Sequence, residues 1–208
     1  MDTIPLSLNG STDLPAGKIA TVVTYYERTV PVTSPPAADP NLSVRRVAPP
    51  NTAWYRELYQ RIGQNWLQFQ AAALSEERLA AILSNPATAI LTLVEHDATV
   101  GLAELNFAIP GEVEIAVFGV VPRVAGGRGA NALMRGTLVE AFRPGIGRAW
   151  LRTSALDHPL AMRLFHKHSF RPYKFAIEVV DDPRLTGRLR PEAAPRVPLI
   201  HPHQYHGG

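Results

Sequence analysis

Cysteine is absent from this chain of 208 residues, and its absence removes several kinds of chemistry at once. Without a thiol there can be no disulfide, no thiolate-bound metal and no cysteine nucleophile. Long apolar runs are missing too, because no stretch approaches the roughly 18 apolar residues that a membrane span needs. The first residues, MDTIPLSLNGS, have neither the basic nor the apolar region of a signal peptide. We therefore expect a cytoplasmic protein with no membrane partner.

Strong charge of either sign is also lacking. The chain has 21 Lys and Arg against 18 Asp and Glu, which gives a formal net charge of +3. The basic residues form no concentrated stripe, so no nucleic-acid partner is expected, whereas small anionic ligands suit a mildly basic protein. His166 and His168 are two apart on a predicted helix and point to different faces, and three more histidines lie in the tail HPHQYHGG. We expect no metal site.

Proline, by contrast, is abundant, with 19 residues. Residues 1–42 are expected to form an N-terminal arm, with one strand at Lys18–Val30 and a proline-rich linker at Pro31–Pro40. The pattern leaves open whether this arm packs on the rest of the chain. Residues 43–180 are expected to form one α/β domain, and residues 181–208 a C-terminal extension.

Apolar periodicity divides the domain into elements in the order β, α, α, β, β, β, α, β, α, β. Helices are predicted after caps at Asn51 and Ser75. Three consecutive strands with short turns, at Thr88–His96, Thr99–Ile109 and Glu112–Val121, predict an antiparallel meander. The order favours an α/β (α+β) fold, in which a mixed, mostly antiparallel sheet of six to seven strands is flanked by about four helices.

A glycine-rich turn joins the third meander strand to the next helix. The sequence VFGVVPRVAGGRGANALM (Val117–Met134) passes from an apolar run through a proline to three glycines within four residues. Such a turn lets backbone N–H groups converge on an anion, and the helix N-terminus adds partial positive charge there. It is neither a Walker loop nor a GxGxxG motif. Tight packing of the helix on the strand explains the glycines equally well.

This stretch resembles motif A of the GNAT acetyltransferase superfamily, in which a V-x-P element leads into a turn of the form R/Q-x-x-G-x-G/A. The first element corresponds to Val120–Pro122 and the turn to Ala125–Ala130. Downstream, DHPLAMRLFHKHSFRPY resembles motif B, and this region is also similar to bacterial GNAT proteins of undefined substrate. The resemblance covers about two thirds of the chain. It implies an N-acetyltransferase that moves an acetyl group from acetyl-CoA to a primary amine of a small molecule or peptide by direct attack.

The resemblance also implies where the co-substrate acetyl-CoA binds. The turn would hold its pyrophosphate, and the backbone of the preceding strand would pair with its pantetheine arm. Phe165 would pack against the pantetheine or acetyl end, although core filling explains this residue at least as well. The implied contacts are Phe118, Gly119, Val120, Ala125, Gly126, Gly127, Arg128, Gly129, Ala130, Asn131 and Phe165.

Transfer to an alkylamine calls for a general base, because an amine with a pKa near ~10 is protonated at neutral pH. Glu114 is the first candidate, since several GNAT histone acetyltransferases carry a base glutamate at the matching distance before the turn. Strand alternation predicts that it shares a face with Ala116 and Phe118. Glu104, on the neighbouring strand, is the second candidate. For both, the alternative is a solvated glutamate on an exposed face.

Three positions depart from the superfamily pattern. Ala125 stands at the Arg/Gln position, Arg128 stands at the first motif glycine, and Phe165 stands where a tyrosine often protonates the leaving thiolate. These departures keep two alternatives open: a non-catalytic CoA-binding or regulatory module with the GNAT fold, and a scaffold that uses the fold for association. Sheet-edge dimers are frequent in this superfamily, so a homodimer is one assembly that the resemblance allows.

Aromatic residues between the two early helices are candidates for the acceptor pocket, because GNAT enzymes shape that pocket there. These residues are Tyr59, Trp66 and Phe69. Aromatics at helical spacing more often fill a core, so a core role is the favoured interpretation. His158, before a proline, is interpreted as a turn or cap residue.

Overall fold

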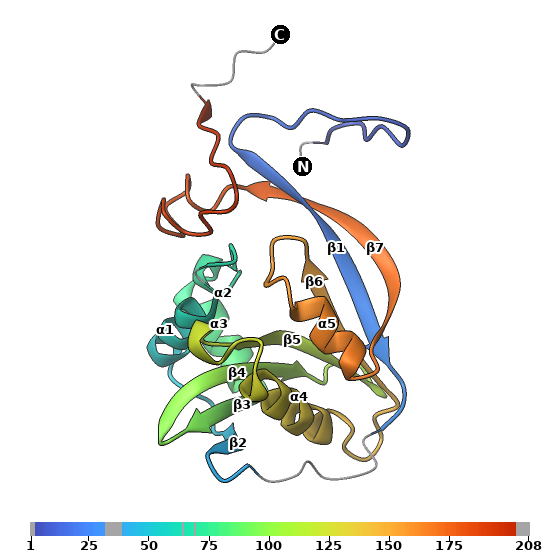
Figure 1. Ribbon diagram of the computed structural model, residues 1–208, viewed down its shortest axis with the longest axis vertical. Helices are drawn as coiled ribbons and strands as arrows, with labels where there is room; N and C mark the ends of the chain where they lie inside the picture. Colours follow the sequence, from blue (N-terminus) through green and yellow to red (C-terminus); the bar gives the residue numbers. More distant parts are fainter. Residues whose placement is uncertain (1–2, 32–38, 64, 69, 203–208) are drawn as a thin grey trace.

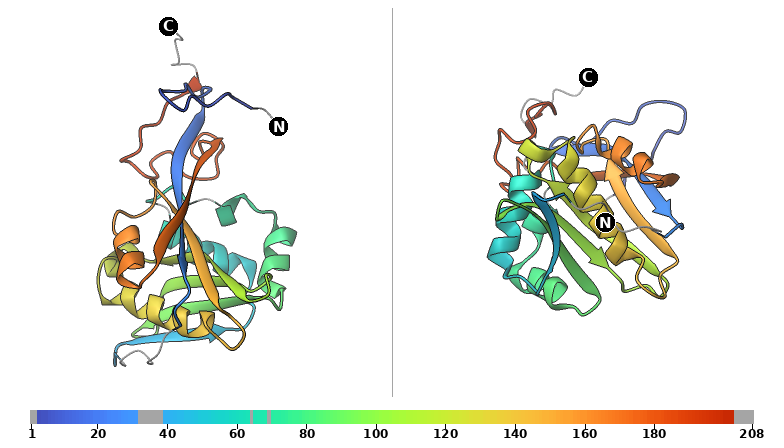
Figure 2. Two further views of the ribbon diagram at one scale, coloured as in Figure 1. Left: turned by 90° about the vertical axis from the view of Figure 1, so that its right-hand side faces the viewer. Right: turned by 60° about the horizontal axis from the view of Figure 1, so that its bottom comes forward.

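Within the described residues the chain forms a sheet of seven strands with helices on both faces (Figures 1 and 2). The computed structural model describes residues 3–31, 39–63, 65–68 and 70–202. The strands are β1 (Lys18–Arg28), β2 (Leu42–Val47), β3 (Thr88–Glu95), β4 (Ala98–Asn106), β5 (Glu112–Val120), β6 (Arg148–Ser154) and β7 (Arg171–Asp181). The helices are α1 (Thr52–Gly63), α2 (Gln70–Ala73), α3 (Glu76–Ser84), α4 (Arg128–Ala141) and α5 (Ala161–Lys167), with a 3-10 turn η1 (Pro122–Val124).

The sheet is mostly antiparallel, as the sequence predicts. Its spatial order is β2-β3-β4-β5-β6-β1-β7. Strands β2 to β5 form an antiparallel series, and β5 and β6 are the pair that runs parallel. A parallel pair requires a crossover, and the chain makes it through η1 and α4.

The N-terminal strand lies inside this sheet. β1 pairs with β6 on one side, from Val23 to Arg28, and with β7 on the other, from Lys18 to Glu27 (Figure 1). Segments from the two ends of the chain therefore complete the sheet together. β7 is left as one edge strand of the sheet, and β2 is the other.

Helix boundaries follow the predicted caps. The Asn51 side chain accepts a hydrogen bond from the backbone N–H of Trp54 at 2.9 Å, and the Ser75 side chain accepts one from Arg78 at 3.2 Å. Each cap satisfies an N–H group that has no partner within its helix. α1 ends at Gly63, before Trp66, and the sequence pattern gives no sign of the short α2.

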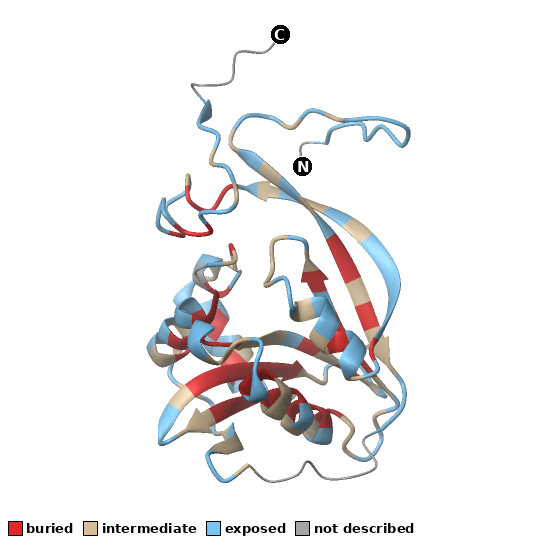
Figure 3. Cartoon of the chain, viewed as in Figure 1, coloured by how far each residue is buried: buried red, intermediate tan, exposed pale blue. Residues whose placement is uncertain are grey.

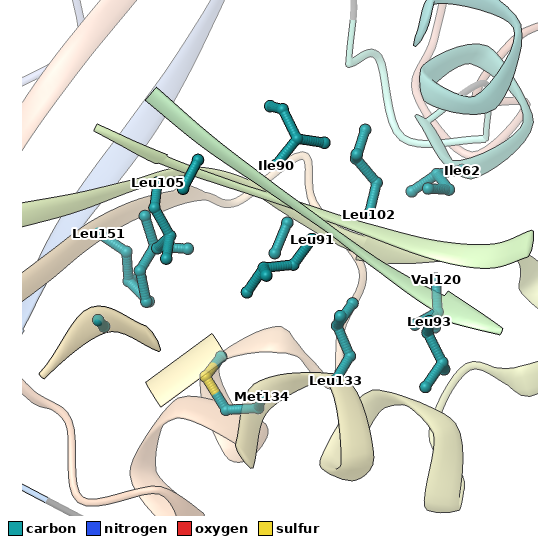
Figure 4. Close-up of a cluster of buried hydrophobic side chains, with 14 of the residues drawn as sticks. Ile62, Ile90, Leu91, Leu93, Leu102, Leu105, Val120, Leu133, Met134 and Leu151 are labelled. Atoms are coloured by element: carbon teal, nitrogen blue, oxygen red, sulfur yellow. The ribbon is translucent and has the colours of Figure 1, made fainter. Parts of the chain in front are cut away.

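The hydrophobic core fills both sides of the central strands. Leu133 and Met134 of α4 are fully buried against one face, and Ile62 of α1 packs on the other (Figure 4). Gly101 of β4 lets α4 approach closely, because a Cβ at this position would lie 3.1 Å from the Leu133 side chain. Burying each such large side chain stabilises the fold by roughly 1.5–3 kcal/mol. The two helices are thereby fixed on opposite faces of the same strands.

A buried ion pair organises the chain after β7. The side chains of Arg184 and Asp182 are 2% and 6% exposed, and Nη2 lies 2.7 Å from Oδ2. Arg184 also donates to the carbonyl oxygen of Val197 at 2.7 Å. Leu189, within the same segment, packs against Leu67 after α1. The C-terminal segment therefore folds back on the body of the protein.

Replacing Arg184 with methionine should destabilise this segment, because Asp182 would remain as a buried charge without its cationic partner. Removing one member of a buried pair costs about 3–5 kcal/mol, whereas replacing both members is far milder. Hydrogen exchange of the backbone amides of this segment, followed at increasing urea concentrations, measures the change in its free energy of unfolding. The double variant Asp182→Asn/Arg184→Met should recover much of the loss. Equal stability of the Arg184→Met variant and the parent protein would contradict this prediction.

Candidate active site

The principal cavity lies where β5 and β6 separate. These two strands pair at three positions, from Glu112 with Arg148 to Glu114 with Trp150. From Ile115 onward, β5 pairs with β4 alone among the described strands. A cavity of about 560 Å³ opens along the separated strands. Its volume is in the range of small-molecule sites, roughly 300–1,000 Å³.

A β-bulge in β5 controls which side chains face α1. Val117 pairs with Glu104 of β4, yet Ile115 pairs with the very next residue of β4. Ala116 is therefore the extra residue of the bulge. Residues directly opposite each other on neighbouring strands share a face of the sheet, so the alternation of β5 changes at this point.

The bulge corrects the predicted face of Glu114. This residue pairs with Asn106, which lies two residues from Glu104 on a regular part of β4 and so shares its face. Glu114 is therefore on the face of Glu104 and Val117. The prediction that Glu114 shares a face with Phe118 was wrong because strict alternation does not continue through an inserted residue.

Glu104 is a buried carboxylate in the wall of the cavity. It is 8% exposed, and its Oε2 accepts a hydrogen bond from the Tyr55 hydroxyl at 2.5 Å. Burial raises the pKa of Glu104, the hydrogen bond from Tyr55 partly offsets this, and the charge of Glu114 raises the pKa further. The Tyr55 ring stacks on Tyr59, whose hydroxyl donates to Gln70 at 2.9 Å. A fixed carboxylate with a raised pKa suits a proton acceptor.

Glu114 is half-buried and is not part of the cavity wall. Burial raises its pKa, whereas the charge of Arg152 and a hydrogen bond from Asn106 lower it. Of the two carboxylates that the sequence put forward as a base, the structure brings Glu104 to the cavity.

The glycine turn before α4 forms another part of the cavity wall. Gly127 caps the helix, and Arg128 is the first helical residue. Gly126 has a φ of +73°, and a Cβ there would lie 2.8 Å from the Leu160 side chain, so the position requires glycine. The turn residues that line the cavity are Ala125, Gly126, Ala130 and Asn131. The N–H groups of the first turn of α4 have no partner within the helix, so this corner is suited to an anion.

The other predicted turn residues have different surroundings. The side chain of Arg128 is 84% exposed, and its guanidinium lies 3.4 Å from the carboxylate of Asp39. Gly129 is buried, and a Cβ there would lie 3.1 Å from Val124, so its role is close packing. Neither residue, nor Gly127, lines the cavity.

Two cations of α5 line the cavity, and the sequence analysis missed them. Arg163 and Lys167 are four residues apart, so they lie on one face of the helix. The helix lies beside the start of α4, since Leu160 meets Gly126 and the Nε2 of His168 lies 3.2 Å from the side-chain oxygen of Asn131. The i, i+4 spacing of the two cations was the available signal.

Phe165 serves both the core and the cavity wall. It is 5% exposed, and its ring centroid lies 5.7 Å from that of Tyr26 and 6.5 Å from that of Phe118. Gly119 lies beside Phe118 on β5, and a side chain there would collide with Ile62. The predicted β5 residues that line the cavity are Phe118, Gly119 and Val120.

The C-terminal segment covers the part of the cavity around Trp66. The ring centroids of Trp66 and His158 are 4.6 Å apart. The Arg196 guanidinium lies 4.4 Å from the centroid of the Trp66 ring. Arg196 also donates to the carbonyl oxygen of Asp157, another residue of the cavity wall, at 2.6 Å. Phe69, another of the aromatic residues that the sequence analysis named as pocket candidates, is outside the described residues.

Solved structures share this arrangement of strands and helices. The GCN5-related N-acetyltransferase from Sphaerobacter thermophilus matches with a TM-score of 0.59 and 18% identity, over 81% of this chain and 52% of that one. The chain has the GNAT fold. The GCN5-related N-acetyltransferase from Kribbella flavida matches with a TM-score of 0.54 and 14% identity, over 82% of this chain and 63% of that one. The Escherichia coli ribosomal-protein-S18-alanine N-acetyltransferase matches with a TM-score of 0.52 and 14% identity, over 68% of this chain and 94% of that one.

This chain thus spans about half to two thirds of the first two of these GNAT structures. No protein-family model matches its sequence, and no curated protein matches it. Over the described ranges, no helix is long and apolar enough to cross a bilayer. The same part of the chain holds no group of three or more histidines and carboxylates that could bind a metal.

Removing the Tyr55 hydroxyl should raise the pKa of Glu104 further, because the carboxylate would lose the hydrogen bond that stabilises its charged form. A carbon-detected NMR titration of the Glu104 carboxyl in the Tyr55→Phe variant measures this. Tyr59→Phe is the matched control, since that hydroxyl bonds to Gln70 instead. A Glu104 pKa that stays constant or falls in Tyr55→Phe would contradict the assigned contact.

Proposed function

We propose that this protein transfers an acetyl group from acetyl-CoA to a primary amine of a small molecule or peptide. The observation that carries the proposal is one continuous cavity that reaches from the glycine turn of α4 to the buried carboxylate of Glu104. The turn suits an anion, and the carboxylate suits a proton acceptor. The fold is the one found in several N-acetyltransferases.

The α4 end of the cavity suits the pyrophosphate of acetyl-CoA for three reasons. Gly126 contributes bare backbone to the cavity wall, the first amides of α4 are available as donors, and Arg163 and Lys167 add positive charge from α5. Along β5, residues 115–120 present backbone groups toward the gap left by β6, where an extended amide-containing chain can pair with them as a strand does. Acetyl-CoA, when bound there, supplies the thioester.

We assign the role of general base to Glu104. An alkylamine with a pKa near ~10 must lose a proton to attack a carbonyl carbon, and the raised pKa of Glu104 strengthens it as the acceptor of that proton. The new C–N bond forms as the C–S bond breaks, and the electron pair leaves with sulfur. A thiol with a pKa near ~8.5 departs readily as the thiolate, so Phe165 can stand where other GNAT proteins have a tyrosine.

Other side chains of the cavity wall favour a positively charged acceptor. Asp157 and Glu178 line the same cavity, as do the aromatic rings of Tyr59 and Trp66. Arg152 offsets part of this charge, since it lies 3.7 Å from Glu178. An ammonium group is attracted by carboxylates and by aromatic faces, so these walls support an amine before it loses its proton.

A non-catalytic CoA-binding module is the second candidate. Two observations favour it: Phe165 has no hydroxyl, and Arg128 pairs with Asp39 outside the cavity wall. Such a module would keep the α4 turn functional and would have no use for Glu104.

The decisive experiment measures CoA release across a panel of amines. Glu104→Gln should lower turnover by ~10²–10⁴-fold, the usual contribution of a general base. Thermal stabilisation by acetyl-CoA should change little. Glu114→Gln is the matched control and should retain most of the activity, because that carboxylate is not in the cavity wall.

Two other outcomes would decide against this assignment. Stabilisation by acetyl-CoA with no CoA release from any amine supports the binding module. Full turnover in Glu104→Gln, with reduced turnover in Glu114→Gln, would return the role of base to Glu114.

A further inference from the structure

Asn131 occupies the corner of the cavity where the glycine turn becomes helix α4. It lies in the first turn of α4, lines the cavity and is half-buried. Its side-chain nitrogen donates a hydrogen bond to the carbonyl oxygen of Gly127, the N-cap residue, at 3.0 Å. A carbonyl oxygen can only accept, so the NH2 group of Asn131 must be the end of the amide that faces Gly127.

The other end of this amide, its oxygen, contacts a histidine. The Nε2 of His168 lies 3.2 Å from the side-chain oxygen of Asn131. Because an amide oxygen can only accept, Nε2 must carry the proton and donate it. Burial, and after it the positive charges of Arg135, Lys167 and Arg28, lower the pKa of this imidazole to about 4. The ring is therefore neutral at neutral pH and has a single N–H, which this contact uses.

The backbone holds His168 in place. This residue is the C-cap of α5, and its N–H bonds to the carbonyl oxygen of Leu164 at 3.1 Å. Arg28 of β1 donates from Nη1 to the carbonyl oxygen of His168 at 2.5 Å. A cation suits this position, because the last carbonyl groups of a helix have no partner within it. The imidazole is thus fixed beside the first turn of α4.

The contact links two elements that together form the anion-binding corner. Most of α5 is exposed, and Phe165 is the one buried residue of this helix (Figure 3). At the start of α5, Leu160 meets Gly126 of the glycine turn, and at its end His168 meets α4. The two cations of α5 that line the cavity lie between these contacts. His168 therefore helps to set the position of those cations relative to the amides of α4.

We propose that His168 is a positioning residue for the diphosphate of coenzyme A. By donating to the oxygen of Asn131, it fixes the amide so that the NH2 group faces the turn. One N–H of that group bonds to Gly127, and the second serves a phosphate oxygen of the ligand. This role rests on the proposed function, in which the diphosphate binds at the start of α4.

The orientation of the Asn131 amide matters because the turn has few other donors in its side chains. Ala125 and Ala130, which also line the cavity, end in methyl groups, and Gly126 has no side chain. Without the proton on Nε2 of His168, the amide could turn over. Its oxygen would then face both the Gly127 carbonyl and the diphosphate, and an acceptor forms no hydrogen bond with either.

A double-mutant cycle on the binding of coenzyme A, measured by titration calorimetry, tests this role. His168→Leu removes the donor and should weaken binding roughly three- to tenfold, the usual effect of one hydrogen bond. In an Asn131→Ala background the same substitution should have little further effect, because the group that it positions is gone. His168→Gln should restore most of the affinity, since a glutamine amide can place an N–H near the position of Nε2.

His166→Leu is the matched control. This second histidine of α5 is exposed and is not part of the cavity wall, and its Nε2 lies 3.4 Å from the Tyr26 hydroxyl instead. The variant should bind coenzyme A as the parent protein does, and circular dichroism should confirm that all variants are folded. In the ligand-free parent, NMR of the ring nitrogens should find His168 neutral and protonated on Nε2. A proton on Nδ1 would overturn the proposal.

The outcomes separate this role from the proposed function. An equal loss from His168→Leu in both backgrounds, or no recovery in His168→Gln, would overturn the positioning role alone. The expected cycle in a protein that transfers no acetyl group to any amine would support the role of His168 and overturn the enzyme. A parent protein that does not bind coenzyme A would overturn both.

Discussion

The separation of β5 from β6 is the constraint on which the site depends. If these strands stayed paired beyond Glu114, their side chains would close over the space and their backbone groups would satisfy one another. Backbone groups that a sheet does not pair need water or a ligand instead, since leaving them buried and unpaired is costly. The gap is maintained by the elements packed on either side: α1, where Ile62 lies against Gly119, and α4 with α5 on the opposite face.

Within that gap, different kinds of chemistry come from different elements. The glycine turn of α4 and the cations of α5 supply a setting for an anion, while β4 and α1 supply a buried carboxylate with its tyrosine partner. The burial that raises the pKa of Glu104 also means that folding with this carboxylate charged costs free energy. A carboxylate placed at such a cost is typical of functional sites. The C-terminal segment, held by the pair of Asp182 and Arg184, adds a cover around Trp66.

Local sequence signals located the elements, the turn and the antiparallel meander, but not the contacts between segments distant in the chain. The caps at Asn51 and Ser75 and the proline-to-glycine passage before α4 act within a few residues, so they can be recognised in the sequence. The bulge at Ala116 cannot, because it is defined by which β4 residues oppose it. For that reason strict alternation assigned Glu114 to the face of Phe118, whereas the family resemblance ranked it ahead of Glu104.

The place of β1 between β6 and β7 also depends on contacts between residues distant in sequence. The same is true of the two cations of α5: their spacing is visible in the sequence, but the side of the helix that faces the cavity is not.

The central claim is that the gap along β5 and the start of α4 bind coenzyme A as one site. Titration of the isotope-labelled protein with coenzyme A, followed through backbone amide resonances, tests it most directly. The account predicts saturable shifts in both segments at once, at Phe118–Val120 and at Gly126–Asn131, with a common dissociation constant. Resonances of both segments that stay in place while coenzyme A is added in excess would contradict it.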